Sequence, residues 1–299
     1  MGYTVGSKQV IKDDNKTKLN TLTVSTSDNY LEITEVLGPP MFGSTTGFSF
    51  GGRIYPTYTS TQDIYSFPFA ISYPAVASDT GGNLIKVVYN HGSGQSKTEG
   101  FSVGGVDPDG RTSITKFPFA ITSGTGSSAG DLNTESRIMA VASSLTECFS
   151  SGGFNNAPGS TASNIIQKFP FSVPFATATD TTGDLIETVA ETSSQANTEN
   201  AFVSGGRITS TNTWVKTIEK FPFNISSGTA TDVGDFSPFV RQEGDGSSSE
   251  TNGFVMNGAP SQPLSKRIYS FPFAITSGTG TYVGDINPIG FYDARNSQR

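Results

Sequence analysis

Short alternations of apolar and polar residues run along the chain, separated by clusters of Gly, Pro, Ser, Thr and Asn. Alternation places every second side chain on the same face of a strand, and such clusters favour turns. In one representative stretch the pattern predicts four strands, at 136–143, 147–152, 164–171 and 177–184. We therefore expect an all-β chain.

Three motifs recur in constant order and indicate that the chain is built from repeats. Phe-Pro-Phe begins at Phe67, Phe117, Phe169, Phe221 and Phe271, so its spacing is 50, 52, 52 and 50 residues. Phe-x-x-Gly-Gly precedes it, beginning at Phe48, Phe101, Phe149 and Phe202, with a variant at Phe254. Gly-Asp follows it, beginning at Gly130, Gly183, Gly234 and Gly284, with Gly82-Asn83 in the first copy. Four strands in about 50 residues are the size of a propeller blade.

The Phe-Pro-Phe motif falls on the third strand of each repeat. Its two Phe side chains share one face of that strand, so we expect successive blades to bury them against each other. The Pro between them cannot donate a ladder hydrogen bond, so we expect the fourth strand to pair weakly there or to begin beyond it.

The two ends of the chain determine the number of blades. Five full repeats cover 30–285 and leave 1–29 and 286–299. At an offset of 98 residues the N-terminus aligns with the second to fourth strands of a repeat, because 2–7 matches 100–105 and 17–19 matches 115–117. The C-terminal end occupies the place of a first strand. We expect one domain, 1–299, that forms a six-bladed β-propeller closed by both ends, which leaves few exposed sheet edges. The alternative is five blades with an N-terminal arm.

Composition and charge exclude several kinds of function. Nineteen Lys and Arg against 26 Asp and Glu give a net charge of −7, which disfavours nucleic acid and anionic membranes as partners. The chain has no run of 18 apolar residues, so we expect no membrane insertion. Its N-terminus lacks a basic segment followed by an apolar stretch, so we expect no signal peptide. With one cysteine, Cys148, and one histidine, His91, we expect no internal disulfide, no metal and no cofactor.

The repeat resembles known families. The repeat is similar to the kelch pattern in its order of motifs: Gly-Gly, then Ile-x-Lys-Phe-Pro-Phe, then Gly-Asp-Leu. Copies such as 218–223 followed by 229–235 resemble still more closely the repeat proteins carried by marine tailed bacteriophages, including cyanophages. The resemblance covers nearly the whole chain and implies a virion-associated, kelch-like propeller. Kelch propellers also include copper radical oxidases, but those need several His and Tyr ligands and a cross-linked Cys. This chain has a single His and a single Cys, so we do not expect that activity.

Single candidate residues for catalysis or metal binding are weak. His91 lies in Asn90-His91-Gly92 and is predicted to be an ordinary turn residue, and Cys148 is predicted to be a small buried hydrophobe. The sequence 107–110 resembles the start of a calcium loop but lacks the closing Glu, which favours a tight turn. Acidic residues recur near the turn between the first two strands and could form a cation-binding ring, although solvated hairpin charges are favoured; they are Glu99, Glu147 and Glu199.

Loop lengths indicate where a partner binds. Between the Gly-Gly and the Ile before Phe-Pro-Phe there are 11, 8, 12, 11 and 9 residues, whereas the distance from Gly-Asp to the next second-strand Phe is nearly constant. Variation on a rigid scaffold is typical of recognition. These variable loops carry the candidate contacts to a partner or glycan: Tyr55, Tyr58, Asp107, Arg111, Asn155, Asn156, Arg207, Trp214 and Gln262.

Among these candidates we expect Trp214, Arg207, Tyr58 and Arg111 to be the main anchors, because aromatic and Arg side chains are enriched at binding hot spots. We expect neither Trp214 nor Arg207 to belong to the repeat core. Local packing of Trp214 is the alternative, and the outer rim, where a fourth strand could extend a neighbour's sheet, is the competing surface.

Taken together, these features predict a non-enzymatic virion protein that is assembled in the host cytoplasm. It would be a rigid disc in a tail or tail fibre, or a capsid decoration, and its partners would be other virion proteins or a host surface glycan. One alternative is a glycan-cleaving propeller enzyme with acidic residues around a central channel. Another is a cytosolic kelch-type adaptor.

Overall fold

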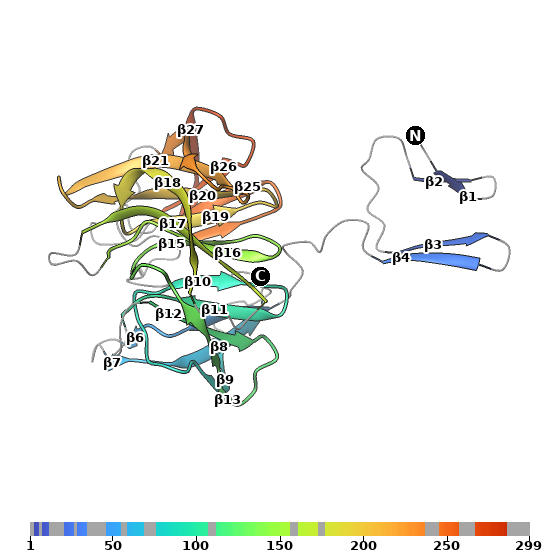
Figure 1. Cartoon of the computed structure of the whole chain (residues 1–299), viewed down its shortest axis with the longest axis horizontal. Coiled ribbons are helices and arrows are strands. Elements are labelled where there is room, and N and C mark those ends of the chain that lie inside the picture. The colour runs from blue at the N-terminus through green and yellow to red at the C-terminus, as the bar shows by residue number, and fades with distance from the viewer. Residues whose placement is uncertain are drawn as a thin grey trace. The chain divides into compact units, whose positions relative to one another are not determined.

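The computed structural model describes residues 3–5, 8–11, 21–26, 29–34, 46–54, 59–68, 76–106, 112–155, 161–172, 177–236, 245–256 and 267–285. These residues form strands, bridges and turns without any helix, so the expected all-β class is confirmed for them (Figure 1). The chain divides into two compact units, Met1–Gly43 and Ser44–Arg299.

The first unit contains two hairpins within its described residues. Strand β1 (Tyr3–Val5) pairs with β2 (Lys8–Ile11), and β3 (Thr21–Thr26) pairs with β4 (Asn29–Thr34). Each hairpin is a separate two-stranded sheet, so these residues do not show the expected partial blade. The closing segment 286–299 lies outside the described residues. The sixth blade and the single domain over 1–299 stay predictions.

The second unit contains the five repeats, whose strands lie side by side in chain order. Repeat 1 contains β5 (Thr46–Phe50), β8 (Asp63–Pro68), β9 (Ser78–Asn83) and a small hairpin of β6 (Arg53–Ile54) with β7 (Thr59–Ser60). Repeat 2 contains β10 (Gly92–Gln95), β11 (Glu99–Val103), β12 (Ser113–Pro118) and β14 (Ser127–Asp131). Repeat 3 contains β15 (Ala140–Ser143), β16 (Glu147–Ser151), β17 (Ser163–Pro170) and β18 (Thr179–Val189). All four strands predicted from the sequence are present, but β15 begins at Ala140 and not at 136, because Ile138 is left-handed, and β18 continues beyond 184 to Val189.

Repeat 4 contains β19 (Ser193–Ala196), β20 (Asn200–Ile208), β21 (Thr213–Pro222) and β23 (Thr231–Phe236). Repeat 5 contains β24 (Asp245–Ser248), β25 (Asn252–Met256), β26 (Arg267–Pro272) and β27 (Thr279–Asp285). Every third strand ends at the Pro of Phe-Pro-Phe, and in repeat 4 the fourth strand stops pairing at Lys220, two residues before Pro222. The expected effect of this Pro on pairing is confirmed.

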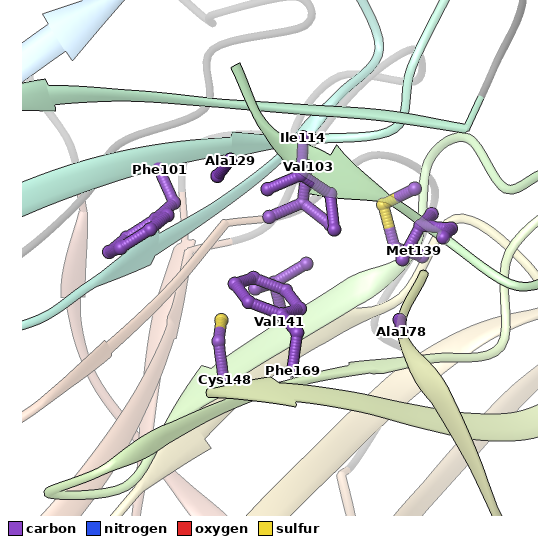
Figure 2. Close-up of a cluster of buried hydrophobic side chains, with 10 residues drawn as sticks. Phe101, Val103, Ile114, Ala129, Met139, Val141, Cys148, Phe169 and Ala178 are labelled. Atoms are coloured by element: carbon purple, nitrogen blue, oxygen red, sulfur yellow. The ribbon is translucent and has the colours of Figure 1, made fainter. Parts of the chain in front are cut away.

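Aromatic rings pack between consecutive repeats as the sequence predicted. The second-strand Phe of each repeat contacts both Phe of the next repeat's Phe-Pro-Phe motif. Ring centroids of the closer pair are 5.0 Å apart for Phe48 and Phe119, 5.4 Å for Phe101 and Phe171, 5.1 Å for Phe149 and Phe223, and 5.1 Å for Phe202 and Phe273. Figure 2 shows one such core, in which residues of repeat 2 face residues of repeat 3: Phe101, Val103 and Ile114 opposite Val141, Cys148 and Phe169.

A second contact joins the outer strands, and it was not predicted from the sequence. A Thr just before the fourth strand, or at its first residue in repeat 5, pairs in parallel with the Asp or Asn of the preceding repeat's Gly-Asp motif. These pairs are Thr125 with Asn83, Thr177 with Asp131, Thr229 with Asp184 and Thr279 with Asp235. Glycine fits best at this position between repeats, because Gly234 has φ +153° and a Cβ on it would lie 2.7 Å from the Gly278 carbonyl oxygen of the next repeat. Each repeat therefore extends the sheet of the one before it.

The outer face of the last repeat differs from the equivalent internal faces. Val233 of repeat 4 is 2% exposed beneath repeat 5, whereas Val283, at the same position of repeat 5, is 52% exposed. Phe254 is likewise only partly buried, in contrast with the fully buried Phe202. Within the described residues nothing covers this face as the next repeat covers the others.

Candidate binding face

The hairpins between the second and third strands carry all nine predicted contact residues. Six of these lie outside the described residues: Tyr55, Tyr58, Asp107, Arg111, Asn156 and Gln262. The other three, Asn155, Arg207 and Trp214, come from the hairpins of repeats 3 and 4. The structure brings Arg207 and Trp214 together as a directly opposed cross-strand pair.

The repeat 4 hairpin continues its two strands past the Gly-Gly motif. Gly206 pairs with Val215, and Ile208 pairs with Thr213 before the turn. Gly206 has φ +113°, and a Cβ there would lie 2.8 Å from the Ala190 carbonyl oxygen, so only glycine fits this position without strain. The close approach sets the hairpin against the segment that leads into β19.

Arg207 is held from several sides. Its Nη2 lies 2.7 Å from Oε1 of Glu191, whose side chain is 3% exposed, and its Nη1 donates to Oδ1 of Asn212 at 3.1 Å. Its guanidinium also lies over the rings of Phe154, at 5.7 Å, and Trp214, at 5.6 Å. The expectation that Arg207 stands outside the packing of the repeats is wrong, because it closes a buried ion pair and contacts repeat 3.

Trp214 is half-buried, and the turn beyond it is the most exposed part of the hairpin. The exposed residues Ser210, Thr211, Asn212 and Thr213 carry uncharged hydroxyl and amide groups. The turn is fastened to repeat 3 because Ala162 N donates to Thr209 Oγ1 at 3.2 Å. Asn155 lies at the base of the neighbouring hairpin, where its N donates to the Thr161 carbonyl at 3.0 Å.

A line of left-handed residues supports these hairpins, and sequence reasoning missed it. Asn90, Ile138 and Glu191 precede the first strands of repeats 2, 3 and 4 and have φ values of 56°, 53° and 63°. They are linked through backbone hydrogen bonds, from Ile138 N to Asn90 O at 2.8 Å and from Glu191 N to Ile138 O at 2.9 Å. A β-branched residue such as Ile rarely adopts this conformation, so the surrounding contacts must impose it. Only Asn90 carries a sequence signal for it.

One position of the third strand makes a polar contact with the preceding repeat. In repeat 3, Gln167 accepts from Thr134 N at 2.8 Å and donates to Thr134 O at 3.1 Å. In repeat 4 the equivalent Glu219 accepts from Ile186 N at 2.7 Å and from Glu187 N at 3.2 Å. Burial raises the pKa of Glu219 to about 7, although the two N–H groups oppose the shift.

Other candidate groups are engaged in packing or in ion pairs. Cys148 is fully buried, and burial raises its pKa to about 12, which disfavours a reactive thiolate. The prediction that His91 is an ordinary turn residue is wrong: it lies directly before β10, is 1% exposed and packs against Phe50 with the ring centroids 5.4 Å apart, so it is a core residue. Glu99 pairs with Lys116 at 2.7 Å and Glu147 with Lys168 at 3.1 Å.

The described residues contain neither a metal-binding cluster nor a membrane-spanning helix. No cluster of His, Cys, Asp or Glu among them is arranged to hold a metal ion, and they contain no helix long and apolar enough to cross a membrane. The turn predicted at 107–110 lies outside the described residues. In comparisons with known proteins, no family model and no curated protein matches the chain.

Proposed function

We propose that the five repeats are blades of a six-bladed, kelch-like β-propeller whose last blade combines 1–29 with 286–299. The four equivalent aromatic interfaces, the chain-ordered sheets and the exposed face of repeat 5 support this arrangement. The terminal alignment supplies the missing blade. Deletion of 1–27 should lower the melting temperature of the whole ring, because repeat 5 would lose its neighbour. Unchanged melting would favour five blades with an N-terminal arm.

The function we propose is a non-enzymatic virion component, which acts as a rigid interaction disc in a tail, tail fibre or capsid decoration. The observation that carries it is the contrast between constant interfaces and variable hairpins: each repeat packs on the next through the same Phe contacts, while the hairpins differ in length and sequence. A scaffold with variable loops is suited to recognition. The resemblance of 218–223 and 229–235 to phage repeat proteins supports the virion setting.

Mass spectrometry of purified phage particles tests this function. We expect the chain to copurify with particles through a density gradient and to be present at a constant ratio to the major capsid protein. Absence from particles, together with abundance in infected cells, would contradict the virion assignment and favour an adaptor. Turnover of a host polysaccharide that is lost when acidic residues are replaced would contradict the non-enzymatic assignment.

A further inference from the structure

The chemistry of the repeat 4 hairpin indicates what kind of partner it fits. Resting on the proposed function, we propose that Trp214 and the hairpin turn form a binding site for an uncharged saccharide. The alternatives at such a surface are a protein or an anionic ligand, and the side chains of the hairpin disfavour both.

The turn is rich in groups that suit sugar hydroxyls. Ser210 and Thr211 are exposed and carry hydroxyls that both donate and accept, and the exposed Asn212 adds an amide. The Thr213 hydroxyl is used within the turn, where it donates to the Thr211 carbonyl at 3.3 Å. Protein–protein hot spots are instead poor in Ser and Thr and rich in Trp, Tyr and Arg. A turn of small polar side chains next to one indole therefore matches a polyhydroxylated ligand better than a protein surface.

Trp214 supplies the apolar part of the site. The guanidinium of Arg207 lies over the indole at 5.6 Å, and Trp214 is half-buried, so part of the residue is accessible to solvent. The negative face of an aromatic ring attracts the weakly positive C–H groups of a pyranose ring, and an indole offers a large area for this contact. A sugar ring can stack there while its hydroxyls reach the turn.

The charges at this site favour an uncharged ligand. The positive charge of Arg207 is balanced by Glu191 at 2.7 Å, so the guanidinium next to Trp214 is not an open site for a carboxylate or phosphate. The chain as a whole carries a net charge of −7, which further disfavours anionic polymers.

The site is also held in one conformation before a ligand arrives. Arg207 Nη1 fixes Oδ1 of Asn212 at 3.1 Å, which leaves the amide N–H groups to donate outward. Thr209 is anchored to Ala162 of repeat 3 at 3.2 Å, so two repeats brace the turn. Preorganisation of this kind reduces the entropy lost on binding.

The chain's only tryptophan allows a direct test. The purified full-length chain is titrated with a panel of neutral hexose, deoxyhexose and N-acetylhexosamine oligosaccharides, and the emission of Trp214 is recorded. We expect at least one saccharide to shift that emission. Asn212→Asp keeps the acceptor for Arg207 and tolerates the left-handed backbone but removes the outward donors, so it should weaken binding about tenfold, which is about 1.4 kcal/mol.

Trp214→Ala should abolish the binding, measured by isothermal calorimetry because the fluorophore is lost. Leu145→Ala is the matched control, because Leu145 is 44% exposed in the turn between β15 and β16, at the other end of the sheet from the hairpins. This variant should bind the saccharide like the wild type.

The proposal is overturned if no saccharide binds at about 1 mM, or if Asn212→Asp and Trp214→Ala both bind normally. Capture of a virion protein by the hairpin without sugar binding would overturn it and leave the proposed function intact. If the chain binds a sugar but is absent from particles, the saccharide site stands and the proposed virion function is contradicted.

Discussion

The junction between repeats 2 and 3 and the junction between repeats 3 and 4 share their apolar contacts but differ in their polar ones. In the first, Phe101 packs on Phe171 at 5.4 Å, and in the second Phe149 packs on Phe223 at 5.1 Å. The equivalent polar residue is the neutral Gln167 in the first and the buried carboxyl Glu219 in the second. Sequence repetition thus fixes the apolar interface and leaves the polar contact free to vary.

The chemical difference between these residues has an energetic consequence. The Gln167 amide both donates and accepts, so it satisfies an N–H and a carbonyl without carrying charge. Glu219 is 2% exposed and receives two N–H groups, which favour its ionised form, while burial disfavours that form. The second junction therefore contains a titratable group that the first lacks.

The largest effect should come from the shared apolar contacts. Phe169→Ala and Phe221→Ala each remove a fully buried ring, and each should lower the free energy of unfolding by about 3–5 kcal/mol. Urea unfolding followed by circular dichroism measures both values. Losses that differ severalfold between the two variants would contradict equivalent apolar interfaces.

Arg207→Ala should have the next largest effect, and it sharpens the contrast because repeats 3 and 4 meet through this residue. Loss of the guanidinium removes the positive charge of Arg207 from the carboxyl of Glu191, whose side chain is 3% exposed, and should lower stability by about 2–4 kcal/mol. Differential scanning calorimetry measures the loss of stability. The double variant Arg207→Ala/Glu191→Gln should recover part of that stability. A melting temperature equal to that of the wild type would show that the ion pair does not support this junction.

Glu219→Gln should remove a pH dependence. Since burial raises the pKa of Glu219 from 4.5 to about 7 in the folded chain, the folded state binds the proton more tightly than the unfolded one. The contribution of Glu219 is then complete below about pH 4.5 and is lost as the pH rises through 7. Because the amide does not ionise, the stability of the variant relative to the wild type should rise by about 1–3 kcal/mol between pH 5 and pH 8. The Nε2 of the introduced Gln would face one of the two N–H groups and lower the stability of the variant equally at every pH.

The matched variant Gln167→Glu should introduce the same dependence at the other junction, because it places a carboxyl at the equivalent position. Chemical denaturation of both variants and the wild type at pH 5, 6, 7 and 8 provides the comparison. If the free energies of unfolding of the wild type and Glu219→Gln differ by the same amount at every pH, Glu219 does not titrate in this range.

The smallest effect should come from the partly exposed ion pairs between the second and third strands. Lys168→Ala removes the 3.1 Å pair with Glu147, whose side chains are 30% and 28% exposed. Solvent screens such pairs, so the expected loss of stability is about 0–1 kcal/mol at low salt, and it should shrink further in 0.5 M NaCl. A larger loss that does not depend on salt would show that Lys168 acts through packing.

Much of the scaffold could be predicted from the sequence because the repeat reports apolar packing directly. The Phe spacing predicted both the strands and the packed rings, and the Pro of Phe-Pro-Phe correctly indicated that the fourth strand stops pairing near it. The parallel pairing of Thr229 with Asp184 could not be foreseen, because backbone hydrogen bonds leave no side-chain pattern.

The candidate site was less predictable for a related reason. Loop variation and residue type singled out Trp214 and Arg207 as separate candidates, but the sequence did not predict that they face each other across the hairpin. The partner of Arg207 could not be found, because Glu191 lies 16 positions earlier and is brought close only by the left-handed turn before β19. Ile138 adopts the same turn without any residue type that favours it.

If consecutive repeats are blades of one closed ring, a cryo-EM or crystallographic density map of the full-length chain will show that ring. We expect six radial sheets around one axis, with density for 286–299 and 1–29 in the sheet that covers Val283 and Phe254 of repeat 5. Five sheets closed directly between repeats 5 and 1, with the N-terminal residues outside the ring, would contradict this arrangement.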